Sequence, residues 1–311
     1  MSGPVLLTGI GGLIGHAVAR MLVAQGCEVI ALDRVPVPDA PCPVLPHEIG
    51  DVHRLHELVL RHGIRRIVHA GSISGPMVAP EAPAKVLAVN LGGLIDVLEV
   101  ARIHRIARVA WFSSILAYEQ RGGEAPVAED APLGAEEAYG ASKVAGEAVL
   151  RAYAAAHGVD GVCFRVASCY GPGRTTSCFV RTLVENALAG RPTRVPDAAR
   201  RDRQHVYVDD VAAAVVAALD APGPLPRRAY NLGPGEALTA AEVAAQVGRG
   251  VPGVVLQEDP SVPLANSFNL GPLDIGAARR ELGFTPRTGL AEGAARVAAW
   301  IGAGRTRTMI A

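Results

Sequence analysis

Two side chains of this 311-residue chain, Tyr139 and Lys143, have a spacing that would let them share proton chemistry. They are four residues apart, so a helix would place both on one face, with Cβ atoms about 5–6 Å apart. We expect a lysine ammonium at that distance to stabilise a phenolate and to lower the tyrosine pKa from about 10. Such a tyrosine can act as general acid and base on an alcohol or a carbonyl. Pairs with this spacing are also common on solvated helices, so other motifs must support the interpretation.

A second segment of chemical interest is the glycine-rich stretch 8–15, which reads Thr-Gly-Ile-Gly-Gly-Leu-Ile-Gly. Glycines here would let the backbone bend tightly and approach a pyrophosphate at a helix N-terminus, although such turns also occur for steric reasons alone. Asp33 closes the next predicted strand and is placed to accept hydrogen bonds from the ribose of an adenosine. Its carboxylate would repel a 2′-phosphate, whereas Arg34 could pair with one. We expect NAD, with NADP as the less favoured cofactor.

Short β-branched runs alternate with longer alanine-rich segments, and these elements must position the residues named above. This alternation predicts βαβ units around a parallel sheet. Strands are predicted at 5–8, 28–32, 66–69, 108–113 and 161–166, and helices at 13–25, 52–62, 82–104 and 139–157. The proline-rich stretch 35–46 is predicted to be a loop with a short edge strand. Beyond Gly171, helices at 177–189, 209–219, 239–247 and 289–300 predict a smaller lobe beside the sheet.

Composition excludes several classes of protein. Thirty basic and thirty acidic side chains cancel, so no net charge would recruit nucleic acid or anionic lipid. No uninterrupted apolar run approaches the roughly 20 residues of a membrane-spanning helix, and the start of the chain lacks the basic region of a signal peptide. The five cysteines are odd in number and lack CxxC spacing, which argues against a disulfide framework or a zinc site. We expect a soluble cytoplasmic protein without a bound metal.

The spacing of Gly9, Gly12 and Gly15 after a threonine resembles the extended short-chain dehydrogenase/reductase family, in its NAD-dependent epimerase/dehydratase branch. Further similarities to that family follow in its order along almost the whole chain. They are segments 50–52, 68–71, 90–93, 112–114, 165–172, 203–211, 230–233 and 282–286. The resemblance implies a doubly wound parallel Rossmann sheet with a smaller mixed α/β C-terminal substrate lobe. The NAD-binding domain would span 1–170, with its sheet completed by later segments, and the substrate lobe 171–311.

The resemblance also implies roles for individual residues. The catalytic residues would be Ser114, Tyr139 and Lys143: Tyr139 would transfer the hydroxyl proton, Lys143 would lower its pKa and bind the nicotinamide ribose, and Ser114 would hydrogen-bond the reacting oxygen. The implied cofactor contacts are Gly9, Gly11, Gly12, Leu13, Ile14, Gly15, Asp33, Arg34, Asp51, Val52, Ala70, Gly71, Ser72, Asn90, Ser113, Tyr139, Lys143 and Val166. Asn90 is also interpreted as a bridge to backbone and water, and His69 as a buried or cofactor-lining residue.

The substrate contacts implied in the same way lie mostly in the second half of the chain. They are Ser74, Ser114, Ser168, Arg174, Thr175, Arg203 and His205. Arg203 could bind a substrate diphosphate or pair with Asp202. The hydroxyl-rich segment 173–177 could bind a carboxylate, a phosphate or a polyol, cap the next helix, or do both. His205 could face the substrate or pack against its strand.

Three departures from the family pattern narrow the chemistry. Ile115 and Leu116 replace the Asp-Glu pair that follows the catalytic Ser/Thr of the family's dehydratases, which disfavours a 4,6-dehydratase. Ser168 replaces an asparagine, and Pro196-Asp197-Ala198 replaces a Gly-Asp-Gly segment. Both of these regions help to hold a nucleotide diphosphate in the sugar-nucleotide enzymes.

These observations leave three functional hypotheses. The first is an NAD-dependent oxidoreductase or epimerase acting on a hydroxyl of a sugar or sugar nucleotide. The second is an NAD-dependent dehydrogenase of a free sugar, sugar acid or small hydroxy acid. The third is a non-catalytic NAD-binding regulator, which the presence of Ser114, Tyr139 and Lys143 argues against.

By resemblance, helices 82–104 and 139–157 would pair across a two-fold axis to form a homodimer. The expected partner is therefore a small molecule, not nucleic acid or a membrane.

Overall fold

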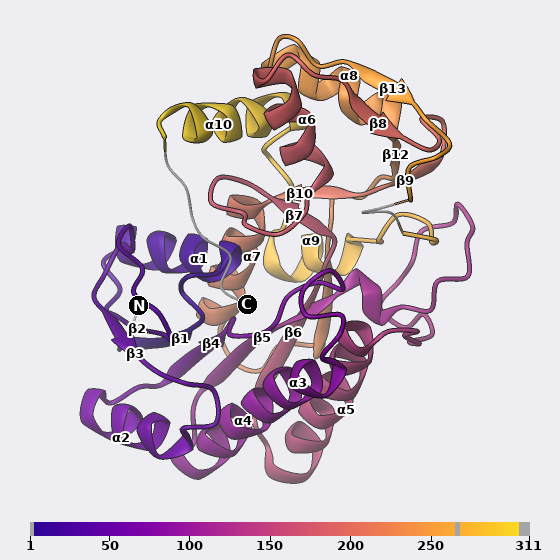
Figure 1. The fold of residues 1–311 in the computed structure, drawn as a ribbon. Helices are drawn as coiled ribbons and strands as arrows, with labels where there is room; N and C mark the ends of the chain where they lie inside the picture. Colours follow the sequence, from indigo (N-terminus) through magenta and orange to yellow (C-terminus); the bar gives the residue numbers. More distant parts are fainter. Residues whose placement is uncertain (1–2, 265–267, 305–311) are drawn as a thin grey trace.

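A seven-stranded, fully parallel sheet forms the centre of the molecule (Figure 1). The structure is a computed structural model that describes residues 3–264 and 268–304. Its strand order is β11-β6-β5-β4-β1-β2-β3. The strands are β1 (Val5–Thr8), β2 (Val29–Asp33), β3 (Val44–Pro46), β4 (Arg66–His69), β5 (Arg108–Ser114), β6 (Gly161–Val166) and β11 (Ala229–Leu232). Every residue of β1, β4, β5 and β6 is buried, as expected of a sheet covered on both faces. The predicted doubly wound fold is confirmed.

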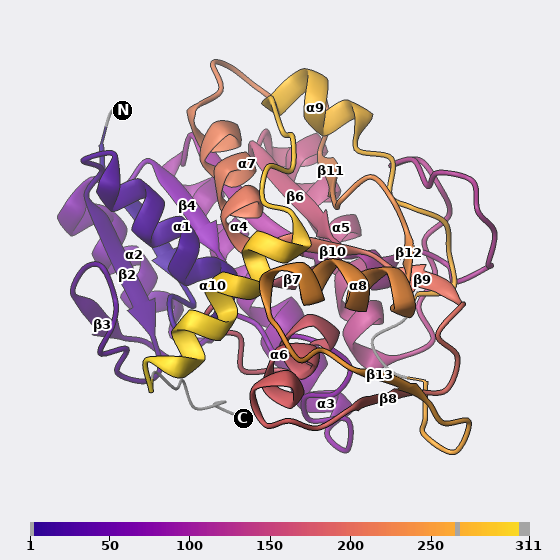
Figure 2. The same cartoon turned by 90° about the horizontal axis from the view of Figure 1, so that it is seen from above.

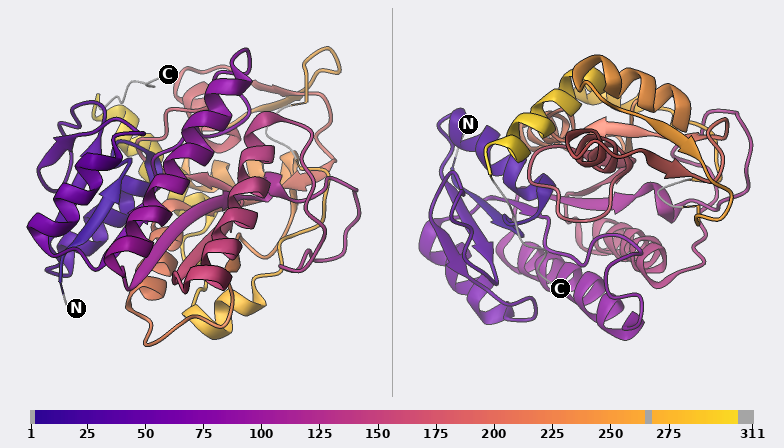
Figure 3. Two further views of the ribbon diagram at one scale, coloured as in Figure 1. Left: turned by 90° about the horizontal axis from the view of Figure 1, so that it is seen from below. Right: turned by 45° about the horizontal axis from the view of Figure 1, so that its top comes forward.

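Helices cover the two faces of the sheet, and the strand residues alternate between the two resulting cores. On one face lie α1 (Leu13–Ala24) and α7 (Val208–Asp220), which pack together. On the other lie α2 (Val52–His62), α4 (Gly93–His104) and α5 (Ala138–His157), seen from below on the left of Figure 3. Val5 and Leu7 belong to the first core and Leu6 to the second, the alternation that a strand imposes.

The predicted helix 82–104 consists of three pieces. They are α3 (Pro83–Leu87), a π-helical turn (Ala88–Gly92) and α4. The residues at both junctions keep right-handed helical dihedral angles, so the chain does not leave the helix between pieces. Such π turns insert an extra residue and often occur at functional sites. Here the turn contains the buried Asn90.

A smaller lobe sits across one end of the sheet (Figures 1 and 2). Its helices are α6 (Phe179–Leu188), α8 (Ala240–Gly250) and α10 (Leu290–Gly302). Three strand pairs join them: β7 (Ser168–Tyr170) with β10 (His205–Tyr207), β8 (Thr193–Val195) with β13 (Leu256–Glu258), and β9 (Arg201–Arg203) with β12 (Leu238–Thr239).

The later part of the chain also returns to the central sheet. Edge strand β11 pairs with β6, and the short helix α9 (Gly276–Leu282) packs against β11. The helix predicted at 209–219 is α7, which was expected in the smaller lobe but packs against α1 on the sheet. Thus β11 completes the Rossmann sheet from beyond residue 170. Across the described ranges, none of the helices has both the length and the apolar character needed to span a membrane.

Candidate active site

The turn between β1 and α1 requires glycine at two positions. Gly9 has φ +76°, and a Cβ there would lie 2.5 Å from the backbone nitrogen of Gly71. A Cβ on Gly15 would lie 2.2 Å from the carbonyl oxygen of Gly9. Gly12 is the N-cap of α1 and has no side chain that could accept a hydrogen bond from the helix's first N–H groups. The first turn, which includes Leu13 and Ile14, contains no acidic residue. The turn therefore has the backbone access and free N–H donors that a dinucleotide pyrophosphate needs.

Asp33, at the end of β2, is held against this glycine turn. Its Oδ2 accepts a 2.8 Å hydrogen bond from the backbone N–H of Gly11, while the following Arg34 is exposed. Asp51 is the N-cap of α2, and its Oδ1 accepts from the N–H of Arg54 at 3.1 Å. Val52 follows as the first residue of that helix. Asp33 and Asp51, whose carboxylates are predicted to contact the ribose and the adenine, thus each have a backbone hydrogen-bond partner that fixes their position.

The end of β4 and the residues that follow it pack against the glycine turn. Thr8 Oγ1 hydrogen-bonds His69 Nδ1 at 2.7 Å and accepts from the N–H of Gly71 at 3.3 Å. His69 is buried, and burial, aided by the charge of Lys143, lowers its pKa to about 3. A neutral, hydrogen-bonded histidine fits the predicted lining role. The adjacent residues Ala70, Gly71 and Ser72 are partly buried.

The three predicted catalytic side chains come together where β5 ends and α5 begins. Ser114 is the last residue of β5, and its Oγ accepts a 3.1 Å hydrogen bond from the N–H of Leu116. Ser114 and Ser74 lie near the Tyr139 hydroxyl, and their hydroxyl groups favour the ionised form of the phenol. Lys143 lies one helical turn beyond Tyr139 on α5, with Nζ 5.4 Å from the centroid of the Tyr139 ring. Three hydroxyl groups and an amine therefore share one site.

The predicted lowering of the Tyr139 pKa is wrong in this structure. Burial raises the pKa of Tyr139, and the influences that oppose this rise include the hydroxyl groups of Ser114 and Ser74 and the charge of Arg174. Lys143 is only 2 % exposed and lies 5.0 Å from the centroid of the Trp111 ring. Burial lowers its own pKa to about 7, so near neutral pH the lysine carries only part of a charge. Local spacing on the helix could not reveal this depth of burial.

Two predicted cofactor contacts direct their side chains to protein partners. Asn90 Oδ1 accepts from the N–H of Ile73 at 2.8 Å, and its Nδ2 donates to the Ile73 carbonyl and to Ser142 Oγ, both at 3.0 Å. Asn90 therefore bridges the loop after β4 to helix α5, as its structural interpretation predicted. Ser113 Oγ donates to Glu147 Oε1 at 2.6 Å. Val166, the last residue of β6, is buried.

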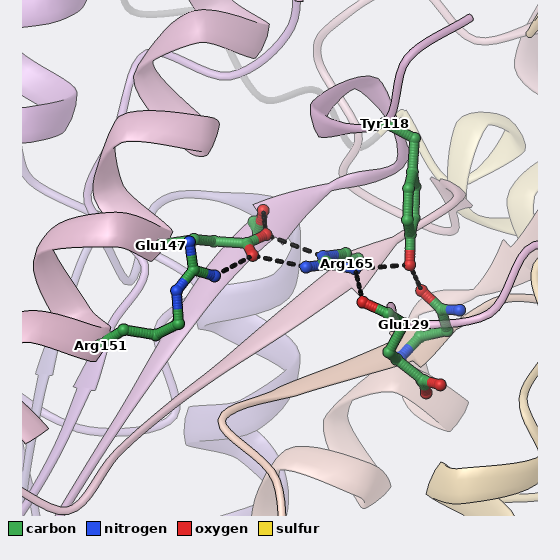
Figure 4. A network of polar contacts seen from close by, with 7 residues as sticks. Tyr118, Glu129, Glu147, Arg151 and Arg165 are labelled. Carbon is green, nitrogen blue, oxygen red and sulfur yellow. Dashed lines mark hydrogen bonds and ion pairs between the residues drawn. The ribbon is translucent and has the colours of Figure 1, made fainter. Parts of the chain in front are cut away.

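Sequence reasoning missed the buried ion pair that anchors α5 (Figure 4). Arg165 Nε lies 2.9 Å from Glu147 Oε1, and its Nη2 lies 2.7 Å from Oε2. Its remaining Nη1 donates to the Tyr118 hydroxyl and to the Glu129 carbonyl, both at 2.7 Å. The sequence did contain a pattern that could have indicated this pair. Glu147 follows Lys143 by four residues, so it lies on the same face of the helix as Tyr139 and Lys143.

The predicted substrate residue Arg174 is engaged with its own loop. Its guanidinium donates to the Cys169 carbonyl, to the Ser177 carbonyl at 2.9 Å and to Thr176 Oγ1 at 3.1 Å. The loop that carries the partly buried Thr175 is therefore fixed by the arginine, whose charge still reaches Tyr139.

Arg203 and His205 lie on successive short strands beside helix α6. Arg203 Nε is 3.0 Å from Asp202 Oδ1, and its guanidinium lies 4.7 Å from the centroid of the Phe179 ring. Of the two alternatives for Arg203, the structure shows the ion pair with Asp202. The His205 ring stacks on Phe179 with centroids 6.3 Å apart, and His205 pairs in register with Ser168. These predicted residues therefore gather in one region of the lobe.

The motif around Arg203 also joins the lobe to the sheet. Gln204 donates to the Gly271 carbonyl and accepts from the Leu273 N–H, both at 2.9 Å. Asp210 accepts from the N–H groups of Arg287 and Thr288, each at 3.1 Å. These contacts hold the C-terminal segments against the strands that carry the candidate substrate residues.

Comparisons with known proteins show what the chain as a whole is similar to. The profile of the NAD dependent epimerase/dehydratase family matches residues 5–233. The UDP-glucose 4-epimerase of Mycolicibacterium smegmatis is 28% identical over 304 residues, which cover 94% of this chain and 96% of the epimerase. The solved structure of an L-threonine dehydrogenase from Cupriavidus necator is 27% identical with a TM-score of 0.85, covering 96% of this chain and 99% of that one.

A second solved structure, the UDP-glucose 4-epimerase of Thermus thermophilus in complex with NAD, is also 27% identical. Its TM-score is 0.82, and the match covers 96% of this chain and 99% of the epimerase. The family profile spans more than half of the chain and includes the glycine turn, Ser114, Tyr139 and Lys143. The chain therefore belongs to the NAD-dependent epimerase/dehydratase family, whose members are NAD-dependent enzymes of the extended short-chain dehydrogenase/reductase type.

Proposed function

We propose that this enzyme moves hydride to and from the hydroxyl-bearing carbon of a sugar or sugar nucleotide. The observation that carries the proposal is the continuous path from the glycine turn to the tyrosine. Gly71 packs against Gly9, while the hydroxyl of Ser74, three residues further on, lies near enough to the Tyr139 hydroxyl to act on its pKa. Three residues of chain span about 10 Å at most, so a dinucleotide held at the turn can extend to the phenol.

The side chains at this position suit proton transfer coupled to hydride transfer. The nicotinamide of bound NAD would accept the hydride and later return or release it. Tyr139 in its phenolate form would take the hydroxyl proton as the hydride leaves, and the resulting phenol would give that proton back when the hydride returns. Ser114 would hold the same substrate oxygen by a hydrogen bond. Lys143, beneath the tyrosine ring, would bind the nicotinamide ribose. Asn90 positions this cluster through Ile73 and Ser142.

The curated relatives favour a sugar-nucleotide substrate. Several are UDP-glucose 4-epimerases, and one covers nearly the full length of both chains. In an epimerase the hydride would return to the other face of a transient ketone, so NAD would be regenerated within one turnover. The same Ser114, Tyr139 and Lys143 would serve both half-reactions.

Net oxidation of a free sugar, sugar acid or small hydroxy acid is the second candidate, and one specific observation favours it. The guanidinium of Arg174 is engaged by its own loop, and that of Arg203 pairs with Asp202. The charge of Arg203 is thus offset by a carboxylate, and all three guanidinium nitrogens of Arg174 already donate within its own loop. The similarity to an L-threonine dehydrogenase of 27% identity and TM-score 0.85 is consistent with a small substrate.

Absorbance of NADH separates the two candidates. Incubation with NAD and UDP-glucose should yield UDP-galactose without net NADH if the enzyme is an epimerase. Stoichiometric NADH release with a non-nucleotide substrate would instead identify a dehydrogenase. In either case Tyr139→Phe should lower kcat by roughly 10²–10⁴-fold. Tyr153→Phe on the same helix is the control, and undiminished turnover by Tyr139→Phe would refute the assigned chemistry.

We also propose that α4 and α5 form the interface of a homodimer. The apolar side chains Leu87, Ile95 and Ile103 are exposed along α3 and α4, at 38%, 37% and 49% respectively. Light scattering of the purified chain should give twice the monomer mass, and Ile95→Glu should shift the mass to that of the monomer.

A further inference from the structure

Asp202 and Arg203 form an ion pair that is almost inaccessible to solvent. Each residue is only 2 % exposed, and Arg203 Nε lies 3.0 Å from Asp202 Oδ1. Arg200 Nε lies 3.1 Å from the other carboxylate oxygen. At such a buried position, charges interact much more strongly than at the surface. The carboxylate therefore offsets the charge of Arg203 before any substrate arrives.

A pyrophosphate at this position would have to overcome two electrostatic costs. It would displace or share a guanidinium already paired with a carboxylate, and it would place its own negative charges near that carboxylate. The nearby Arg174 offers no substitute, because its donors are directed to the Cys169 and Ser177 carbonyls and to Thr176. Of the two arginines implied in substrate binding, Arg203 is thus paired with a carboxylate and Arg174 is hydrogen-bonded to its own loop.

His205 presents a different chemistry in the same region. It lies two residues beyond Arg203 and is 7 % exposed, stacked on the Phe179 ring that Arg203 also covers. Neither ring nitrogen makes a hydrogen bond of good geometry with any residue in the described ranges. Burial and the charges of Arg203 and Arg174 lower its pKa to about 3, so the ring is neutral. A neutral imidazole offers one donor and one acceptor, which suits a hydroxyl group.

We propose that Asp202 determines substrate specificity by neutralising Arg203, so that the enzyme takes a hydroxylated substrate without a diphosphate, bound in part by His205. This inference rests on the proposed hydride-transfer function and narrows its substrate class. Asp202 acts through Arg203 and is a specificity-determining residue, with no catalytic part.

Calorimetric titration of the full-length chain with UDP and with UDP-glucose, in the presence of NAD, tests the proposal. The wild-type protein should bind both with Kd above about 1 mM. Asp202→Asn keeps the shape of the side chain and removes its charge, and should tighten UDP binding by at least about tenfold because Arg203 becomes available for charge-assisted hydrogen bonds. The double variant Asp202→Asn/Arg203→Gln should lose that gain.

Glu124→Gln is the matched control, since Glu124 lines the same open pocket of about 570 Å³ as Asp202 but has an exposed side chain. It should change UDP affinity less than about twofold, because it removes the same net charge without touching Arg203. An equal gain in Glu124→Gln, or no gain in a folded Asp202→Asn, would overturn the proposal. Micromolar binding of UDP-glucose by the wild-type protein would overturn it even if the variant does not fold.

The titration with UDP involves no hydride transfer, because UDP carries no sugar hydroxyl to oxidise at the hydride-transfer site. Undiminished turnover by Tyr139→Phe would therefore refute the proposed function and leave the UDP affinities unaffected. Tight UDP binding would refute the role of Asp202 and leave the hydride-transfer chemistry intact.

Discussion

Arg165 and Glu147 meet in a two-pronged ion pair beneath the candidate active site, with nitrogen–oxygen distances of 2.9 and 2.7 Å. The pair ties α5, which carries Tyr139 and Lys143, to strand β6 (Figure 4). Ser113, on the neighbouring strand β5, donates to the same carboxylate. The position of the tyrosine relative to Ser114 therefore depends on a charge pair that is not itself in the site.

Glu147→Gln should destabilise the protein by about 3–5 kcal/mol, because it leaves the guanidinium of Arg165 buried without its counter-charge. Urea unfolding followed by circular dichroism measures the change. Arg151→Gln is the control: Arg151 is half-exposed and lies 3.5 Å from Glu147, so its loss should cost less than about 1 kcal/mol. Equal losses of stability in the two variants would mean that the buried Glu147–Arg165 ion pair stabilises the protein no more than the exposed contact of Arg151 does.

Gly15→Ala should weaken NAD binding by at least about tenfold, and overpacking at the turn should cost about 1–3 kcal/mol of stability. The added methyl group would lie 2.2 Å from the Gly9 carbonyl oxygen, so the pyrophosphate-binding turn must shift. Titration of NAD by calorimetry checks the affinity. Gly302→Ala should leave it unchanged, since no described atom beyond its chain neighbours and the nearby backbone of its own helix lies within 4 Å of the new methyl group.

Lys143 should make the protein more stable as pH rises above neutral. Burial lowers its pKa from 10.5 to about 7, so between these pH values the unfolded chain binds a proton that the folded chain does not. The free energy of unfolding must then rise with pH across this interval. Lys143→Met should remove that rise, measured by urea unfolding at several pH values between 7 and 10. Replacement of the chain's other lysine, the exposed Lys85, should not alter the pH dependence.

His205 should contribute to loss of stability in acid. Its pKa falls from 6.5 to about 3 on burial, so below about pH 6.5 the unfolded chain takes up a proton that the folded chain excludes. The free energy of unfolding must fall as pH decreases from about 6.5 towards about 3. His205→Phe should reduce this loss in thermal melts, whereas His53→Phe, at an exposed position, should not. Identical acid profiles for His205→Phe and wild type would contradict the buried neutral ring.

Prediction from sequence succeeded where local pattern controls the structure. Helix α2 and strands β4 and β6 were predicted with the observed bounds, because strand alternation and helix caps act over a few residues. The three short strand pairs of the lobe and helix α9 were not predicted. Each of these strands has two or three residues, too few for a periodic signal, and forms only because distant segments meet.

The sequence alone determined the family, the parallel sheet, the need for glycine in the turn and the common face of Tyr139 and Lys143. All of these depend on residue type and short spacing. Only the tertiary structure decided how deeply Lys143 is buried, and that burial of Tyr139 itself raises the pKa of its phenol. It also decided that Arg203 pairs with Asp202 and that Glu147 holds Arg165. Burial and charge pairing arise from segments far apart in the chain, and a charge's energy depends on everything packed around it.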